Sequence, residues 1–416
     1  MSNVEILAPA GSLDGLYASF QMGADAVYVG TSRFGARAFA KNPSVDELKE
    51  ALVYAHMHDK KIYLTVNTLL SDRELENDLF PLIAPLYEAG LDACIVQDLG
   101  VLSFLHENFP QMDLHASTQM TILSGDEAEL YRNYGVTRFV PARECTIEEI
   151  RAMRAQTDLE IEVFVHGALC YCYSGQCLMS EEIGDRSGNR GMCAQPCRLP
   201  FTSAYGNGHL FSTKDMCTLV HIPELVDAGI DSFKIEGRMK SPEYVFAVVA
   251  AYRAAIDRLA CAIDEGTSLE EAGATEEEHR ALSEAFSRGF TEAYLSRRRG
   301  NDIMGYGRPN NRGVFAGRVT KAKGREVAVE SQTELHEGDV LEFWTNKGHF
   351  ASTLEAFERK GDMYYFEIDG RVGKGDRVFR VRDASMAFHD DDLEPRLPAR
   401  MHVVAHIGEP LRFVAE

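Results

Sequence analysis

Eight short runs of β-branched and apolar residues alternate with longer amphipathic stretches from the N-terminus to about residue 265. The strand candidates are VEILA from Val4, AVYVG from Ala26, KIYLTVN from Lys61, ACIVQ from Ala93, DLHAS from Asp113, RFVPA from Arg138, EIEVFVH from Glu160 and SFKIE from Ser232. Eight β/α units of about 30 residues each predict an α/β chain with a TIM-type (β/α)8-like barrel over residues 1–265. The GxGxxG turn of dinucleotide-binding sheets and the P-loop pattern are both absent.

Polar side chains follow the ends of several of these strands. Since a parallel barrel carries its chemistry where strands pass into the following loops, these residues are expected to share one face. They are Asn67, Gln97, Asp98, His115, Ser117, Thr118, Arg143, Glu144, His166, Glu236, Arg238 and Lys240. We predict catalytic roles for His166, His115 and Glu236. The alternative for each histidine is a hydrogen-bonded packing residue, and for each glutamate an ion pair with a neighbouring arginine.

Four cysteines lie within 28 residues, in the spacing C-x6-C-x15-C-x3-C, and Cys172 adds a fifth thiol. The four are Cys170, Cys177, Cys193 and Cys197. Thiolates gathered by loops are the usual ligands of an iron–sulfur cluster or a structural zinc. Zinc sites usually show two short cysteine knuckles, and here only Cys193 and Cys197 form one, so the spacing favours a cluster on one extended loop, residues 162–200. Buried free thiols and disulfides are the alternatives.

Several features argue for a reducing compartment. The nine cysteines are an odd and modest number for 416 residues, and the N-terminus lacks the basic and apolar regions of a signal peptide. No apolar run approaches the roughly 18 residues needed to cross a bilayer. We therefore expect a cytoplasmic protein with no membrane partner.

The net charge of −21 gives no overall attraction to nucleic acid, so DNA is not expected as a partner, and any RNA would need a local basic patch. The densest basic cluster is the run from Arg297 to Arg299. It is read either as a solvated loop or as a contact to phosphate or RNA.

The chain changes character after the predicted barrel. Residues 266–312 read as an acidic helical hairpin followed by a Gly-, Asn- and Arg-rich linker. Residues 313–385 hold six short alternating strands, which predict a small all-β barrel. Residues 386–416 begin another strand pair and are expected to belong to a further, truncated segment.

Three stretches resemble one known family. They are EILAPAG from Glu5, GADAVYVG from Gly23 and SFKIEGRMKSPEYV from Ser232, and the cysteine loop adds a highly specific motif. Its matching positions are Glu162, Phe164, Gly167, Ala168, Cys170, Gly175, Cys177 and Ser180. Over residues 4 to 385 the chain resembles peptidase family U32, also labelled collagenase-like proteases.

The resemblance implies a function different from the family label. Better-understood members look like iron–sulfur proteins that hydroxylate RNA bases or a quinone precursor without molecular oxygen. By that resemblance Cys170, Cys177, Cys193 and Cys197 would hold a 4Fe–4S cluster. Prephenate would supply the hydroxyl group to a pyrimidine in tRNA or ribosomal RNA.

The residues leave three functions open. Arg143, Arg238 and Lys240 are placed to anchor a dicarboxylate cosubstrate in a hydroxylation enzyme. The alternative is a peptidase, yet the GxSxG and HExxH patterns are absent, and a thiol protease would need only one cysteine, for example Cys170 beside His166. The third is a non-catalytic, cluster-bearing scaffold that binds RNA. Oligomeric state does not follow from the sequence.

Overall fold

The computed structural model describes residues 4–37, 40–204, 206–267, 273–296, 301–307, 309–386, 400–404, 406 and 412–415. Eight parallel strands follow the chain around a closed barrel, in which the last strand pairs with both the first and the seventh. They are β1 (Glu5–Pro9), β2 (Ala26–Val29), β3 (Lys61–Val66), β4 (Ala93–Val96), β5 (Asp113–Ala116), β6 (Val136–Phe139), β7 (Glu160–Ala168) and β11 (Ser232–Ile235). The predicted TIM-type barrel is confirmed, and each predicted strand overlaps an observed one, although β6 begins two residues before the predicted Arg138.

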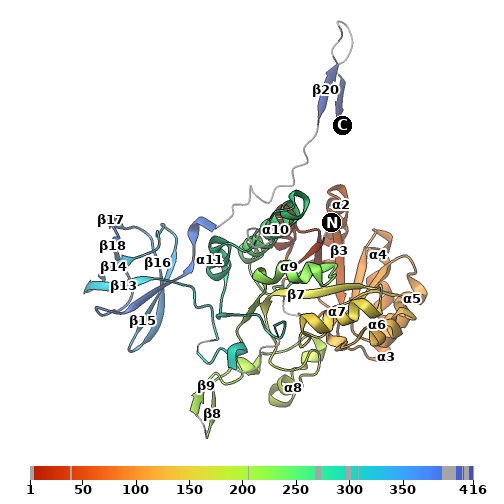
Figure 1. Cartoon of the computed structure of the whole chain (residues 1–416), viewed down its shortest axis with the longest axis horizontal. Helices are drawn as coiled ribbons and strands as arrows, with labels where there is room; N and C mark the ends of the chain where they lie inside the picture. The colour runs from red at the N-terminus through yellow and green to blue at the C-terminus, as the bar shows by residue number, and fades with distance from the viewer. Residues whose placement is uncertain are drawn as a thin grey trace.

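Helices alternate with the strands and cover the outside of the barrel (Figure 1). They are α1 (Leu13–Gln21), α2 (Val45–Met57), α3 (Asp72–Asn77), α4 (Leu79–Glu88), α5 (Leu99–Asn108), α6 (Gly125–Arg132), α7 (Ile147–Gln156), α9 (Ile222–Asp227) and α10 (Pro242–Glu265). Local sequence explains their starts: Ser44 and Glu47 form a capping box on α2, and Pro242 opens α10 after Ser241. No helix in the described part of the chain is both long and apolar enough to cross a membrane.

The lower interior of the barrel is filled by paired charges rather than by apolar side chains alone. The guanidinium of Arg138 lies 2.5 Å from Glu5 and 3.3 Å from Glu162, and Lys234 lies 2.6 Å from Glu162. The hydroxyl of Tyr63 donates to Glu5 at 2.6 Å. Because each buried charge has an opposite partner, this layer closes the amino-terminal end of the barrel, and space remains at the carboxyl ends of the strands.

The segment between β7 and β11 adds structure at that open end. It contains α8 (Met179–Gly184), the hairpin of β8 (Phe201–Ser203) and β9 (Gly206–Gly208), and β10 (Asp215–Cys217). Strand β10 runs antiparallel to β7 and also pairs with β12 (Phe290–Thr291), which extends the sheet beyond the barrel. The cysteine loop therefore follows the seventh barrel strand, as predicted.

A second domain, residues 313–386, is one antiparallel sheet, here called the sheet domain. Its strand order is β16-β15-β19-β13-β14-β18-β17. The strands are β13 (Val314–Lys323), β14 (Glu326–Ser331), β15 (Val340–Thr345), β16 (Gly348–Thr353), β17 (Glu358–Lys360), β18 (Met363–Glu367) and β19 (Arg377–Arg382). The predicted all-β character is confirmed. Farther along, β20 (Met401–Val404) and β21 (Arg412–Ala415) form an antiparallel pair.

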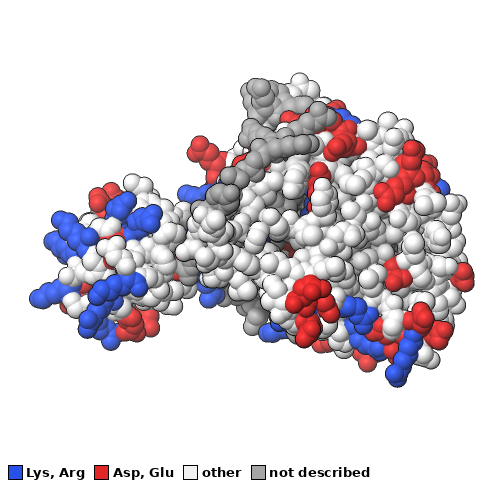
Figure 2. Space-filling view, turned by 90° about the horizontal axis from the view of Figure 1, so that it is seen from below, with Lys and Arg blue, Asp and Glu red and all other residues white. Residues whose placement is uncertain are grey.

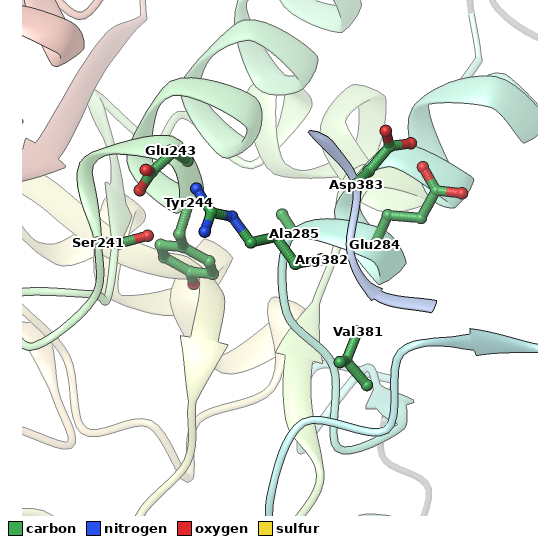
Figure 3. Close-up of a pocket in the computed structure, with 8 residues that line it drawn as sticks. All are labelled: Ser241, Glu243, Tyr244, Glu284, Ala285, Val381, Arg382 and Asp383. Carbon is green, nitrogen blue, oxygen red and sulfur yellow. The ribbon is translucent and has the colours of Figure 1, made fainter. Parts of the chain in front are cut away.

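Buried ion pairs join the sheet domain to the barrel through α11 (Glu276–Ala285). Arg380 of β19 lies 2.5 Å from Glu284 of α11, and three residues beyond α11 Arg288 lies 2.5 Å from Asp215 of β10. Arg380 also forms ion pairs with Asp339 and Asp383, so both of these carboxylates already have a cationic partner within the protein. A cavity of about 370 Å³ lies beside the joint, and Figure 3 shows Arg382 reaching across it toward Tyr244.

Candidate functional site

The four cysteines predicted as ligands line a single cavity of about 230 Å³ at the open end of the barrel. They come from different parts of the loop: Cys170 follows β7 and Cys177 precedes α8. Cys193 lies shortly before the short helical turn Pro196–Arg198 that precedes β8, and Cys197 lies within that turn. Cys170 and Cys193 are exposed, whereas Cys177 and Cys197 are half-buried. The fold thus brings together thiols that lie up to 27 residues apart in the sequence.

A backbone amide supports one of these sulfur atoms. The amide of Gln195 donates to Sγ of Cys193 at 3.3 Å. Hydrogen bonds of this kind to sulfur are one means by which a protein tunes a bound cluster. Burial raises the pKa of the Cys170 and Cys197 thiols.

The spacing of the sulfurs separates two kinds of metal site. A single Zn²⁺ with bonds of about 2.3 Å would hold four sulfurs roughly 3.8 Å apart. Among the described residues, no three cysteine sulfurs lie within 4.8 Å of one another; the one group that meets this limit is His336, Asp339 and Asp383 at the joint. In this arrangement no three of the cysteine sulfurs lie as close together as ligands of one zinc ion would.

Two glycines let the cysteine loop sit directly on the barrel loops. Gly175 has a φ of +71°, and a Cβ there would lie 2.3 Å from the backbone oxygen of Gln119. Gly191 has a φ of +76°, and a Cβ there would lie 2.3 Å from the backbone oxygen of Gly35. Both positions need a left-handed backbone and close approach, which only glycine allows without strain.

We expect Gly175→Ala to destabilise the protein by more than about 1 kcal/mol, since it adds both a clash and an unfavourable φ. Gly184→Ala is the matched control, because that glycine lies in α8 with no atom within 4 Å of the added Cβ. Urea unfolding of the two variants measures the difference. Equal stabilities would show that the loop does not rest on Gln119.

A second, smaller cavity of about 70 Å³ lies at the mouth of the barrel itself. The two cavities share part of their lining, so the cysteine cavity opens onto the barrel mouth. The shared residues are Ala36, Arg37, Thr118, Gln119 and Arg143. The mouth alone is lined by Tyr28, Thr65, Asn67, Ser117, Phe164, Lys234, Glu236 and Arg238.

Glu236 is the central carboxylate of the mouth. It lies 3.2 Å from Arg37 and 3.5 Å from Arg143. Arg143 also donates to the backbone oxygen of Ala168 at 3.0 Å and stacks 3.9 Å above the ring of Phe164. Burial acts to raise the pKa of Glu236, but Arg37 and Arg143 outweigh it and hold that pKa below its usual value. Glu236 is therefore ionised at neutral pH.

Arg238 is a buried cation with neutral partners. It is 3% exposed and donates to Oγ1 of Thr65 at 2.9 Å and to Oδ1 of Asn42 at 2.7 Å. In the described part of the chain it forms no ion pair with a carboxylate, and its Nε has no hydrogen-bond partner. Burial lowers its pKa to about 10, which still leaves it charged. The mouth thus holds three guanidinium groups against one carboxylate and is suited to an anion.

The structure brings together many of the predicted site residues but not all. Glu236, Arg143, Arg238, Asn67, Ser117 and Thr118 line the mouth, and all four cysteines lie beside it. His115, His166, Lys240, Gln97, Asp98 and Glu144 line neither cavity. Asp98 instead caps α5, and Glu144 accepts a hydrogen bond from Ser174. Arg297 to Arg299 lie outside the described residues.

The two histidines predicted as catalytic both lie in packed surroundings. His115 faces the barrel interior, 4.7 Å from the ring of Tyr63, and burial holds its pKa well below its usual range. His166 packs against Tyr244, Tyr252 and Phe290, and neither of its ring nitrogens has a hydrogen-bond partner. Since neither ring reaches a cavity, we assign neither a catalytic role.

Lys240, predicted to bind substrate, also points elsewhere. Its Nζ lies 2.7 Å from the centre of the Phe286 ring, and burial lowers its pKa to about 7. Lys240 lines neither cavity, whereas Arg37 lines both. Arg37 was not among the predicted residues because it lies eight residues beyond the end of β2. The two arginines of the segment TSRFGAR, which follows that strand, were the available sign of a cationic group near the mouth.

His166 provides a pH-dependent prediction. Burial lowers its pKa to about 4 from an ordinary value of 6.5, so the unfolded chain binds this proton first as pH falls. The contribution of His166 to the free energy of unfolding is then fully present above pH 6.5. It is lost progressively as the pH falls toward 4, by up to about 3 kcal/mol. We expect His166→Leu to lose less stability over that interval than the unmodified protein. Urea unfolding at neutral pH and near pH 4 measures it, and identical losses would refute the assignment.

Residues 11–305 match the family model of peptidase family U32. The 23S rRNA 5-hydroxycytidine C2501 synthase of Escherichia coli (strain K12) is 38% identical over 372 residues, 87% of this chain and 56% of that protein. This chain therefore spans little more than half of that relative.

Two further relatives are covered over most of their length. The tRNA hydroxylation protein P of Escherichia coli (strain K12) is 31% identical over 87% of this chain and 91% of its own length. A collagenase of Porphyromonas gingivalis (strain ATCC BAA-308 / W83) is 32% identical over 82% of this chain and 86% of its own. The relatives thus carry names from two classes of activity.

Proposed function

The chain belongs to peptidase family U32, and from this membership and the joined cavities we propose that it hydroxylates a pyrimidine base in RNA without molecular oxygen. The observation that carries the proposal is the position of the four-cysteine cavity directly on a barrel mouth lined by three arginines. The names of two relatives supply the substrate class, RNA, and the reaction, hydroxylation.

Cys170, Cys177, Cys193 and Cys197 would hold a 4Fe–4S cluster. No three of their sulfurs lie as close together as one zinc requires, and a backbone amide already donates to Cys193. When bound, the cluster would supply a Lewis-acidic, redox-active iron beside the reacting groups.

Arg143 and Arg238 would hold an anionic hydroxyl donor such as prephenate, which carries two carboxylates. Arg238 has no carboxylate partner in the described structure, and Arg143 shares one with Arg37. Both arginines therefore keep donors for a ligand. Glu236 fixes the orientation of Arg37 and Arg143, so its own role is positioning.

The side chain of Gln119 offers a contact for the base. It lines both cavities, and its buried Oε1 has no hydrogen-bond partner. An amide in this position can accept from the amino or imino group of a pyrimidine. Exposed aromatic rings beside the cysteines, Tyr171 and Tyr173, would flank an unpaired base as it enters.

The reaction balances with such a donor. Replacing a ring C–H by C–OH oxidises the base by two electrons. The donor must therefore release its hydroxyl group, take up those two electrons and receive the hydrogen that the base gives up. No molecular oxygen is consumed.

A peptidase is the second candidate, because one relative is named a collagenase. A thiol mechanism needs a base beside the nucleophile. His166, the nearest histidine in sequence to Cys170, is buried between three aromatic rings and has no hydrogen-bond partner. The site geometry therefore favours hydroxylation.

The direct test incubates anaerobically purified protein with prephenate and an unmodified RNA transcript, and analyses the nucleosides by mass spectrometry. We expect a pyrimidine nucleoside that has gained one oxygen atom only when protein and prephenate are both present. Cleavage of a collagen-like peptide, with no change in the RNA, would overturn the proposal in favour of the peptidase.

A further inference from the structure

The sheet domain carries three aromatic rings on the face turned away from its core. Its core side holds Leu341, Phe343 and Val378, so the alternate positions Trp344 and Phe379 face outward. The rings of Trp344 and Phe379 lie 4.4 Å apart, and Phe315 of β13 lies 5.5 Å from Phe379. The outer face of an antiparallel sheet is ordinarily polar, so a row of contacting aromatic rings there calls for a ligand.

Two arginines lie among these rings. The guanidinium of Arg377 is 4.9 Å from the ring centre of Trp344 and 5.9 Å from that of Phe379. Arg318 lies 5.9 Å from the ring of Phe315 and donates to the backbone oxygen of Gly375 at 3.0 Å. Within the described ranges neither arginine forms an ion pair with a carboxylate, so both keep donors for an external anion.

One carboxylate shares the face but is already engaged. Glu342 is 6% exposed and accepts a hydrogen bond from Nε1 of Trp344 at 3.2 Å. This bond ties the buried carboxylate to the indole of Trp344. The exposed charges beside the rings are therefore those of Arg318 and Arg377, with His349 packed 4.7 Å from Trp344.

The charge of the sheet domain differs from that of the barrel. Residues 313–386 hold 12 Lys and Arg against 13 Asp and Glu, whereas the whole chain holds 43 against 64. The sheet domain is thus nearly neutral, and the barrel and the remaining segments carry almost all of the negative charge. Figure 2 shows Lys and Arg side chains gathered over the sheet domain, while the centre of the barrel face has few charges.

Aromatic rings that alternate with unpaired arginines on an open sheet match one ligand chemistry. Unpaired bases stack on the rings, and guanidinium groups contact the phosphates between them. We propose that this aromatic face, formed by Phe315, Arg318, Trp344, Arg377 and Phe379, binds a single-stranded stretch of RNA. The proposal rests on RNA being the substrate and gives the substrate a second point of attachment outside the catalytic cavities.

Trp344 makes the test direct, because it is the single tryptophan of the chain. A base that stacks on it should quench its fluorescence, so the emission of the whole protein reports this face alone. The probe is a short single-stranded oligouridine, titrated into the full chain. We expect saturable quenching, with an affinity that weakens as salt increases.

Two variants with the same charge change give the matched comparison. Arg377→Gln removes a cation from the aromatic face, and we expect it to weaken oligouridine binding by about tenfold. Arg359→Gln removes a cation from β17, where the arginine pairs with Glu334, and should leave the affinity unchanged. Trp344→Phe should retain most of the affinity, measured by anisotropy of labelled RNA, whereas Trp344→Ala should lose it.

Three results would overturn the inference: no quenching, equal affinities of the Arg377 and Arg359 variants, or equal affinity for a duplex of the same length. Quenching by an added protein but not by RNA would assign the face to a protein partner. The outcome is separable from the proposed function. If the variants of the aromatic face bind RNA normally while the protein hydroxylates RNA, this inference alone is refuted. If the aromatic face binds RNA but no hydroxylation occurs, the proposed reaction alone is refuted.

Discussion

Replacing Cys170 and Cys177 together by alanine is expected to abolish the bound iron and all hydroxylation. Anaerobically purified protein should carry about four irons and four sulfides per chain and absorb broadly in the visible range. The double variant removes two of four thiolates from one cavity, which leaves too few ligands for a cubane. Iron and sulfide assays with an absorption spectrum measure the loss without any substrate.

Two single variants show whether the loss is specific to the ligands. Cys172 lies within the same loop but does not line the cavity, and Cys261 is exposed on α10. Cys172→Ala and Cys261→Ala should keep their iron. Colourless unmodified protein after anaerobic reconstitution, or one zinc per chain, would refute the cluster.

Arg238→Met is expected to raise the KM for the anionic cosubstrate by roughly 30-fold or more, with a smaller change in kcat at saturation. The reason is that Arg238 is a buried guanidinium whose partners, Thr65 and Asn42, are neutral. A bound carboxylate would be its ion-pair partner, so removal of the arginine withdraws that interaction from the bound state. Initial rates at varied prephenate concentration measure the effect.

Arg151→Met is the control for this variant. Arg151 lies on the outside of the barrel in an exposed ion pair with Asp227, 2.8 Å away, and such pairs contribute little. Its KM should match that of the unmodified protein. If Arg238→Met changed kcat but left KM unaltered, the arginine would not anchor the cosubstrate.

The barrel could be predicted because its signal repeats. Each strand such as AVYVG or ACIVQ is short, apolar and followed by an amphipathic stretch, and eight repeats leave few alternative folds. The cysteine loop could be predicted because thiols at ligand spacing are rare in a chain of this composition. Neither inference needed the orientation of a side chain.

The predicted site residues that lie away from the cavities differ from the others in orientation. His115 lies near the end of β5, yet its position within the strand turns it into the barrel interior rather than toward the mouth. His166 is displaced by the irregular pairing of β7 with β11, which turns its ring toward Phe290. A residue's place at a strand end predicts its height in the barrel, but register and bulges decide which way it points.

The aromatic face was hidden for a related reason. Strands β13, β15 and β19 each contain a register shift, so simple alternation does not reveal that Phe315 and Phe379 lie beside Trp344. Their contact depends on pairing between segments up to 64 residues apart, from Phe315 to Phe379. Only the assembled sheet shows the row.

The buried ion pairs at the joint have a consequence for how a long substrate would be chosen. Arg380 to Glu284, and Arg288 to Asp215, connect the sheet domain to β10 beside the cysteine loop through interactions that are costly to break. A strand of RNA held at the aromatic face would then present bases at a fixed reach from the cavity. The joint would fix the distance between the aromatic face and the cavity. The target base would then be selected by its distance along the RNA strand from the bound stretch, as well as by its chemical identity.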